Sequence, residues 1–444
     1  MTARRAAVEA LLQVDRDGGY SNIVLDRMLR TQALARGERT LASRIFYGVI
    51  ERRLTLDYFL ARCSSLPVKK MHPAVAEILR AGAYQLLFMD RVPPSAAVNE
   101  SVNLARAMGQ DRAAGFVNGV LRGLERRKAD IWASIPAGED GWPVRYSCPP
   151  ALIRLWKRAY GAEKTATLLE HINDVPDIAV RVNTLKTTPE ELAGELAAQG
   201  VHPENMPDLP ACFRFSSADA LKTLAKEREN CYYHQDAASQ YCCAAFDPQP
   251  GERIADVCAA PGGKSFTAAL MMENRGRILS CDIYPAKCEE MERRAQALGI
   301  GIIDTAVRDA AAPCPEPLAG CFDRVLCDVP CSGLGAIRRK PEIRYKDPAS
   351  YAELPALQYA IMEQAARMVR IGGVLQYATC TLNPAENEEV AGRFLAEHPE
   401  FAPRQLPLDA LFAAQGIPPA ASITLFPPEH RTDGFFIAGF TRRG

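Results

Sequence analysis

The chain has 444 residues, of which 48% are hydrophobic and 24% charged. This length exceeds what one ordinary core needs, so two or three domains are expected, and the composition is typical of a globular protein rather than a disordered one. No apolar run approaches the roughly 20 residues of a membrane span, and the start of the chain lacks the apolar core of a secretion signal. We therefore expect a cytoplasmic protein without a membrane partner.

The formal net charge of zero hides an asymmetry along the chain. Residues 1–140 contain 21 Lys and Arg against 15 Asp and Glu, a net charge of +6, and the remainder has 32 against 38, a net charge of −6. A basic first part suggests that it docks an anionic partner. Ordinary surface variation is the alternative explanation.

Fourteen cysteines and six histidines bear on redox state and metal binding. No Cys-x-x-Cys pair occurs, and no histidine is spaced with a cysteine as a zinc site requires, so no metal is expected. Without a secretion signal, the cysteines indicate a reducing compartment in which most thiols are buried and inert.

The first 130 residues have the apolar spacing of helices. Apolar residues recur at helical intervals over 5–29 and 75–87, and a last helix is expected over about 111–128. The break at Val92-Pro-Pro-Ser95 separates the middle helices. Helices of this length with short connections predict a compact all-α bundle.

The next stretch predicts a linker and then a small α+β unit. Residues 135–143 are rich in glycine and proline and indicate a linker. A helix is expected over 149–168 and a strand over 178–183. Thr188-Pro-Glu-Glu191 has the form of a capping box and predicts a helix to about Gln199.

From Gly251 onward, strands and helices are expected to alternate, which predicts an α/β doubly wound, Rossmann-like sheet with ligands at the carboxyl ends of its strands. The candidate strands are 253–258, 277–282, 302–307, 322–328 and 372–379. The predicted domains are the helical bundle (1–140), the α+β subdomain (141–230) and the α/β domain (231–444).

The first of these strands leads into a loop of small residues, Asp256-Val-Cys-Ala-Ala-Pro-Gly-Gly-Lys264-Ser. It is not a P-loop, because Cys258 stands where that motif has its first glycine. The small residues let a ligand approach the backbone, and the following helix supplies free N–H groups. The loop therefore predicts a cofactor site.

Four aspartates follow or end the predicted strands, and they narrow the choice of cofactor. Asp282 stands where an acidic side chain binds ribose hydroxyls, and the others are Asp256, Asp309 and Asp328. Each one alone is explained as a helix cap or turn residue. Together they disfavour a pyrophosphate and suit a nucleoside with a cationic sulfonium, so S-adenosylmethionine fits better than NAD or ATP.

Two cysteines stand at the expected ligand edge. Cys331 follows one predicted strand, and Cys380 follows another, where Asn383-Pro-Ala-Glu386 resembles a helix N-cap with a capping glutamate. A nearby helix N-terminus would lower a thiol pKa. A thiolate that adds to carbon 6 of a cytosine makes carbon 5 nucleophilic toward a sulfonium methyl group. Asp328 is placed to hydrogen-bond the N3/N4 edge of that base.

These segments together resemble the Sun/Fmu-type RNA 5-methylcytosine methyltransferases. The matching segments are the cofactor loop, Asp328-Val-Pro-Cys331-Ser-Gly, Thr379-Cys-Thr381 with the Asn-Pro-Ala-Glu-Asn-Glu that follows, Asp433-Gly-Phe-Phe436, Gln235-Asp-Ala-Ala-Ser-Gln240 and Arg181-Val-Asn183. The resemblance implies that Cys380 is the nucleophile and that Cys331 assists product release. The implied cofactor-binding residues are Cys258, Ala259, Ala260, Pro261, Gly262, Gly263, Lys264, Asp282, Asp309 and Asp328.

Three N-terminal segments resemble the NusB-type RNA-binding helical domain. They are Leu79-Arg-Ala-Gly-Ala-Tyr-Gln-Leu-Leu87, Pro93-Pro-Ser-Ala-Ala-Val-Asn-Glu100 and Phe116-Val-Asn-Gly-Val-Leu-Arg122. The combination implies an S-adenosylmethionine-dependent enzyme that methylates carbon 5 of a cytosine in small-subunit (16S) rRNA. It is expected to act as a monomer on naked rRNA or an early precursor, and not on DNA. The alternatives are the same chemistry on another RNA, or a NusB-like binding module with a vestigial catalytic part. The retained cysteines and aspartates disfavour the second alternative.

Overall fold

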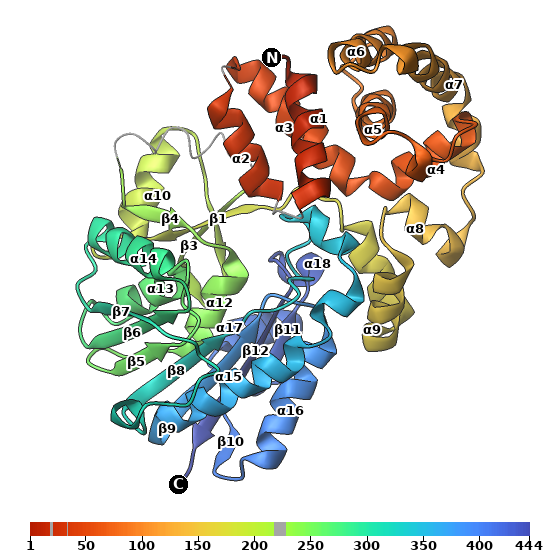
Figure 1. The fold of residues 1–444 in the computed structure, drawn as a ribbon. Coiled ribbons are helices and arrows are strands. Elements are labelled where there is room, and N and C mark those ends of the chain that lie inside the picture. Colours follow the sequence, from red (N-terminus) through yellow and green to blue (C-terminus); the bar gives the residue numbers. More distant parts are fainter. Residues whose placement is uncertain (18–20, 33, 217–227) are drawn as a thin grey trace. The chain divides into compact units, whose positions relative to one another are not determined.

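A computed structural model describes residues 1–17, 21–32, 34–216 and 228–444, and Figure 1 shows the fold. The chain forms two compact units. One consists of Met1–Asp174 with Ile337–Lys346, and the other of Val175–Ala336 with Asp347–Gly444. No helix among the described residues is long and apolar enough to cross a membrane.

The N-terminal unit is helical, as predicted, and its core surrounds α5. Nearly every side chain of α5 is buried, because this helix is apolar on almost all sides. The expected linker over 135–143 instead contributes η3 and α8. The elements are α1 (Ala3–Asp17), α2 (Ser21–Thr31), α3 (Arg36–Glu51), α4 (Arg53–Cys63), η1 (Val68–Lys70), α5 (Pro73–Phe88), α6 (Pro94–Ala107), η2 (Asp111–Ala113), α7 (Ala114–Ala133), η3 (Gly138–Gly141), α8 (Trp142–Arg145), α9 (Pro150–Glu170) and η5 (Pro341–Tyr345). Residues 18–20 of the helical stretch expected over 5–29 lie outside the described residues.

A segment from far along the chain completes this unit. Residues Ile337–Lys346, which include η5, pack with the N-terminal helices. The Arg344 side chain is buried at 2% exposure, and its guanidinium donates four hydrogen bonds of 2.8–3.4 Å. The acceptors are the carbonyl oxygens of Glu51, Ser147 and Ile172 and Oδ1 of Asn173. The segment is therefore anchored by polar contacts as well as by apolar ones.

The second unit begins with a small antiparallel sheet in the order β2-β3-β1-β4. The predicted capping box is confirmed: Thr188 Oγ1 accepts from the Glu191 N–H, and Glu191 Oε2 accepts from the Thr188 N–H, each at 3.1 Å. Leu192 and Leu196 of the helix pack on the sheet. The elements are β1 (Ile178–Val182), α10 (Pro189–Ala198), β2 (Glu204–Met206), β3 (Leu209–Phe215) and β4 (Tyr232–His234).

The large sheet has the order β10-β12-β9-β8-β5-β6-β7, with β11 paired to β12. Strands β5 to β9 are parallel, as predicted, with β9 beginning earlier than expected. The antiparallel strands β10, β11 and β12 were not predicted and make the sheet mixed. The strands are β5 (Arg253–Asp256), β6 (Arg277–Asp282), β7 (Ile303–Val307), β8 (Phe322–Asp328), β9 (Val369–Thr379), β10 (Phe401–Pro403), β11 (Ser422–Leu425) and β12 (Phe435–Arg442).

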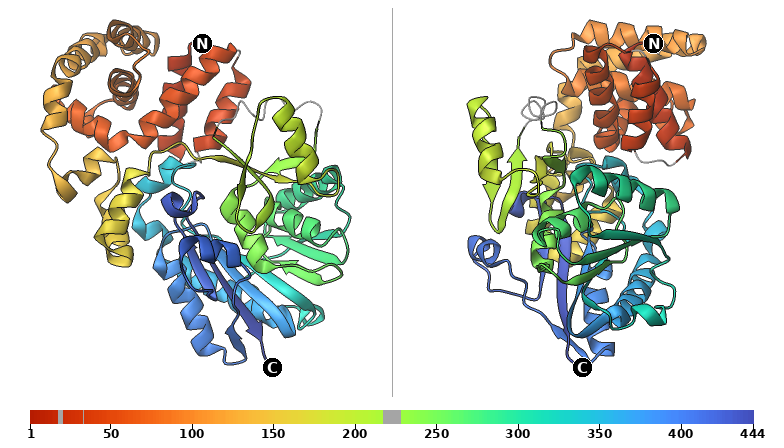
Figure 2. Two further views of the ribbon diagram at one scale, coloured as in Figure 1. Left: turned by 180° about the vertical axis from the view of Figure 1, so that it is seen from behind. Right: turned by 90° about the vertical axis from the view of Figure 1, so that its left-hand side faces the viewer.

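Helices cover both faces of this sheet, as Figures 1 and 2 show. Apolar side chains of α12, α13, α14 and α17 form the core on one face, and those of α15 and α16 form the core on the other. The helices are α12 (Ala237–Phe246), α13 (Gly263–Met271), α14 (Pro285–Leu298), η4 (Glu316–Leu318), η6 (Pro348–Tyr351), α15 (Leu354–Met368), η7 (Pro384–Glu386), α16 (Glu388–Glu397), α17 (Asp409–Gln415) and α18 (Pro427–His430). This packing leaves the two ends of the strands for ligands.

Candidate active site

The cofactor loop runs from the end of β5 to the start of α13, as predicted. Its turn needs a glycine at position 262, where φ is +100°. A Cβ there would lie 2.5 Å from the Phe266 ring, so a side chain is excluded by backbone conformation and by space alike. The turn thus brings the backbone of the loop to the carboxyl end of β5.

Asp256 holds this loop in place and is not an exposed acid at the carboxyl ends of the strands. Its Oδ2 accepts a hydrogen bond from Ser265 Oγ at 2.7 Å, and Ser265 in turn accepts from Ser280 Oγ at 2.8 Å. Burial raises the pKa of Asp256 to about 7. Of the four aspartates expected to face a ligand, this one has a structural role instead.

A second support for the loop was not predicted. Gln235 Nε2 donates to the Gly263 carbonyl at 3.0 Å, and Gln235 Oε1 accepts from Thr267 Oγ1 at 2.6 Å. The Thr267 hydroxyl also lies 2.7 Å from the Tyr233 hydroxyl. Gln235 belongs to a segment that the sequence singled out, but local pattern does not reveal its partner on α13.

Asp282 and Asp309 lie at the same edge of the sheet. Asp282 ends β6, and Asp309 comes two residues after β7, which is the neighbouring strand. Each carboxylate also makes a local turn: Asp282 Oδ1 accepts from the Tyr284 N–H and Asp309 Oδ1 from the Ala311 N–H, both at 3.0 Å. These side chains and the small residues of the loop fit a nucleoside that is held by its hydroxyls.

Lys264 lies with Asp328 rather than alone in the cofactor loop. Its Nζ donates to Asp328 Oδ2 at 2.7 Å and lies 5.2 Å from the centre of the Phe435 ring. Burial alone would lower the pKa of Lys264, but the Asp328 carboxylate outweighs it and raises this pKa. The cation is therefore retained beside the carboxylate at the end of β8.

The two cysteines singled out in the sequence meet. The Sγ atoms of Cys331 and Cys380 are 3.2 Å apart, and both side chains are partly exposed. Strands β8 and β9 are parallel neighbours in which Asp328 lies opposite Ala378, so the loops that follow them run side by side. Hydrogen bonding to Cys380, with burial, raises the pKa of Cys331 well above its usual value.

Backbone bonds join these loops to the start of β12. The Gly335 N–H donates to the Cys380 carbonyl at 3.0 Å, and the Gly434 N–H donates to the Gly335 carbonyl at 2.9 Å. A Cβ on Gly335 would lie 1.9 Å from the Gly434 carbonyl oxygen. The antiparallel register, with Phe436 opposite Thr379, makes this contact possible and explains why Asp433-Gly-Phe-Phe436 accompanies the cysteine motifs.

One expectation at this edge is wrong. Asn383 does cap η7, since its Oδ1 accepts from the Ala385 N–H. The Glu386 carboxylate, however, does not bond the N-cap backbone. It binds the N–H and hydroxyl of Ser332 and the side-chain amide of Asn383, because the pairing of β8 with β9 brings the loop after β8 beside this turn.

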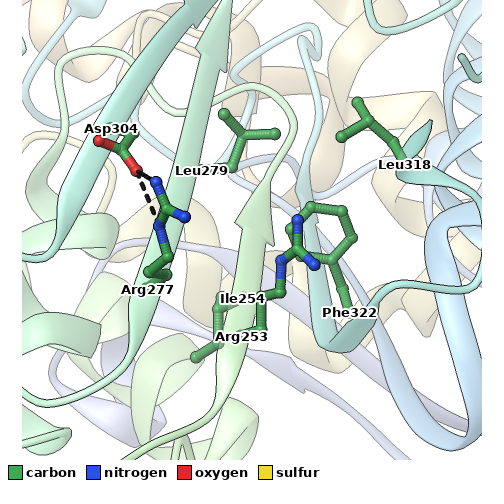
Figure 3. Close-up of a pocket in the computed structure, with 7 residues that line it drawn as sticks. All are labelled: Arg253, Ile254, Arg277, Leu279, Asp304, Leu318 and Phe322. Carbon is green, nitrogen blue, oxygen red and sulfur yellow. Dashed lines mark hydrogen bonds and ion pairs between the residues drawn. The ribbon is translucent and has the colours of Figure 1, made fainter.

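A pocket lies at the other end of the strands, and Figure 3 shows the residues that line it. Its lining includes residues at the amino ends of the strands, where Arg277 pairs with Asp304 at 3.0 Å and Arg253 lies 5.2 Å from the centre of the Phe322 ring. Ligands of parallel α/β sheets bind at the carboxyl ends. The candidate site is therefore the edge that carries the cysteines.

Three family models match parts of the chain. The model described as 16S rRNA methyltransferase RsmB/F matches residues 243–441, the NusB family matches residues 1–126, and the ferredoxin-like domain of RsmF/B-like methyltransferases matches residues 148–222. These matches confirm the resemblance inferred from the sequence motifs, in both the helical and the catalytic part.

Full-length relatives match as well. A probable ribosomal RNA small subunit methyltransferase B from Synechocystis sp. is 34% identical over 444 residues and covers 100% of both chains. The corresponding Bacillus subtilis protein is 33% identical and covers 100% of this chain and 99% of its own. A ribosomal RNA small subunit methyltransferase B from Klebsiella pneumoniae is 30% identical over 99% of this chain and 98% of its own.

Solved structures share the fold. The crystal structure of PH0851 has a TM-score of 0.81 at 26% identity and covers 99% of this chain and 98% of its own. NSun6 from Pyrococcus horikoshii, solved with SFG, has a TM-score of 0.56 at 21% identity over 67% of this chain and 98% of its own. At that identity the second likeness concerns the fold alone.

Proposed function

The chain belongs to the ribosomal RNA small subunit methyltransferase B family, and we propose that it methylates carbon 5 of a cytosine in 16S rRNA through a covalent adduct with Cys380. It is a methyltransferase of rRNA, and its cofactor is S-adenosylmethionine. The observation that supports the cysteine adduct is that the Cys331 and Cys380 sulfurs lie only 3.2 Å apart. Both cysteines lie at the carboxyl ends of the strands, as the cofactor loop does.

The chemistry follows from the poor nucleophilicity of cytosine carbon 5. The Cys380 thiolate adds to carbon 6, and the electrons of the C5–C6 double bond make carbon 5 the nucleophile. S-adenosylmethionine supplies the methyl group from its sulfonium. Water then accepts the carbon 5 proton, which re-forms the C5–C6 double bond and expels the Cys380 thiolate. We assign Cys331 to this release step.

We assign Asp328, together with its partner Lys264, to binding of the target cytosine. One carboxylate oxygen of Asp328 accepts from Lys264, which leaves the other to accept from the exocyclic amine of the cytosine. A charge-assisted bond of this kind stabilises the adduct more than a neutral one. The target base must be unpaired or flipped to reach the thiols.

The cofactor residues proposed from the sequence keep their roles here. Cys258, Ala259, Ala260, Pro261, Gly262, Gly263 and Lys264 form the loop, with Asp282 on the ribose and Asp309 and Asp328 further along the edge. The position of Asp282 at the end of the strand next to β5 supports this assignment.

Two cysteine variants test the adduct. Cys380→Ala should abolish methylation of a 16S rRNA transcript and keep cofactor binding, because the thiolate is needed only for the adduct. Cys331→Ala should accumulate a covalent RNA–protein species, seen as a slow band on a denaturing gel. Near-normal turnover by Cys380→Ala, or a band that persists in the double variant, would refute the assignment. Bisulfite sequencing of the product identifies the methylated cytosine.

We further propose that the basic N-terminal helices hold the rRNA mainly through its phosphates, with the chain acting as a cytoplasmic monomer on naked small-subunit rRNA or an early precursor. The three-domain division (1–140, 141–230 and 231–444) remains part of this proposal. Deleting residues 1–140 is a poor test of RNA binding, because it also removes α3, whose Glu51 carbonyl accepts a hydrogen bond from Arg344.

Neutralising exposed cations tests the binding of RNA instead. Arg126, Arg127 and Lys128 are exposed at the end of α7. Their replacement by glutamine should make the slope of log affinity against log salt shallower by about 0.7–0.9 for each phosphate that the protein no longer neutralises. A matched variant with glutamine at the exposed residues Glu388 and Glu389 should keep the wild-type slope. Equal slopes for all three proteins would show that α7 does not touch the RNA.

A further inference from the structure

Glu386 is a buried carboxylate that the proposed chemistry does not use. It lies at the end of η7 and is 0% exposed. Its Oε1 accepts from Ser332 Oγ at 2.6 Å and from Asn383 Nδ2 at 2.8 Å, and its Oε2 accepts from the Ser332 N–H at 2.8 Å and from Gln358 Nε2 at 2.9 Å. All four partners are uncharged donors. A buried carboxyl group that accepts four hydrogen bonds and has no acceptor for a proton of its own is best satisfied as an ionised carboxylate.

These hydrogen bonds join the two cysteine loops. Ser332 directly follows Cys331, and its hydroxyl lies 2.7 Å from the hydroxyl of Thr381, which directly follows Cys380. The backbone of Glu386 is held as well, since its carbonyl accepts from the Tyr377 hydroxyl of β9 at 2.5 Å. The carboxylate is thus the point at which the loop after β8 and the loop after β9 are fastened together.

The charge of Glu386 also acts on the sulfurs. Two thiolates 3.2 Å apart repel each other strongly, so the pair retains a proton at neutral pH. Glu386 binds the residue next to Cys331, and its negative charge disfavours a second negative charge there. Among the described residues, the titratable groups near this cluster include Tyr377 on β9 and Tyr351 on η6, and burial raises the pKa of both, so they stay neutral. Cys327 of β8 is buried and its pKa is raised as well, and the Asp328 carboxylate that ends β8 is paired with Lys264.

We propose that Glu386 is a positioning residue that fixes the Cys331 loop against the Cys380 loop and keeps the shared proton on Cys331. Cys380 is then the sulfur that acts as the thiolate, and Cys331 is the sulfur that carries a proton. The proposal deepens the proposed function and rests on it for the identity of the nucleophile. It gives a physical reason why two neighbouring cysteines have different roles.

The test is the pH dependence of alkylation of each cysteine in the full-length protein. Iodoacetamide reacts with the thiolate, and peptide mass spectrometry separates Cys331 from Cys380. In the wild type, Cys380 should react at lower pH than Cys331. In Glu386→Gln, the midpoint for Cys331 should fall by about one to two pH units, as expected for removal of a nearby unit charge. The control Glu389→Gln, exposed on α16, should change neither midpoint.

Methyl transfer gives the second readout. Glu386→Gln should lower kcat by about 100-fold, as small misplacements of reacting groups do, with the KM for S-adenosylmethionine unchanged. An unchanged Cys331 midpoint in Glu386→Gln would overturn the proposal, as would wild-type Cys331 reacting at lower pH than Cys380. The wild-type result decides even where the variant does not fold. The alkylation needs neither RNA nor cofactor, so failure to methylate 16S rRNA would count against the proposed function and leave this result intact.

Discussion

Replacing Arg344 with alanine should destabilise the N-terminal unit strongly. The side chain is buried and donates one short hydrogen bond, 2.8 Å to Asn173, and three longer ones to backbone carbonyls. A hydrogen bond to a charged group contributes about 1.5–3 kcal/mol, and each carbonyl left buried without a donor adds a cost. We expect a loss of about 3–5 kcal/mol in the free energy of unfolding, as for other broken buried charge interactions.

The chain offers a selective probe for this measurement. Its three tryptophans, Trp132, Trp142 and Trp156, all belong to the N-terminal unit, so tryptophan fluorescence in urea follows that unit alone. Arg344→Lys should lose less, because an ammonium group supplies three donors to four acceptors. The control Lys70→Ala, at an exposed position of the same unit, should lose less than about 0.5 kcal/mol. A loss from Arg344→Ala no larger than that of the control would refute the reasoning.

Three further variants test the catalytic unit. Asp282→Ala should weaken binding of S-adenosylmethionine by about 1.5–3 kcal/mol because the ribose hydrogen bonds are removed, and unchanged affinity by calorimetry would place the ribose elsewhere. Gly335→Ala should lower methyl transfer about 100-fold, because its Cβ would meet the Gly434 carbonyl at 1.9 Å, whereas Gly392→Ala, which meets nothing within 4 Å, should not. Asp256 has its pKa raised from 3.8 to about 7 on folding, so its contribution to stability is complete below pH 3.8 and is lost as the pH rises to about 7. This loss of unfolding free energy is about 4 kcal/mol at most, and Asp256→Asn should lack it. Unfolding followed by circular dichroism across this pH range gives the measurement, and a pH profile of the variant parallel to that of the wild type would contradict the prediction.

The sequence was sufficient for features that depend on local pattern. Helical spacing identified the N-terminal bundle, and the capping box at Thr188 identified α10. Alternating strands and helices identified β5 to β9 and therefore the edge at which Cys331 and Cys380 stand. The strand β12 was missed, because pairing with the edge of a sheet depends on a distant partner and not on the short apolar run itself.

Only the tertiary structure decided which of these residues touch. Strand order puts the ends of β8 and β9 side by side, and this sets the distance between Cys331 and Cys380. The same arrangement brings the Ser332 loop to the Glu386 carboxylate, and it brings Lys264 to Asp328. Residues 337–346 look like an ordinary connection in the sequence, yet Arg344 finds its acceptors on elements that end near residues 51, 147 and 172. Such partners are set by non-local packing, and periodicity along the chain carries no information about it.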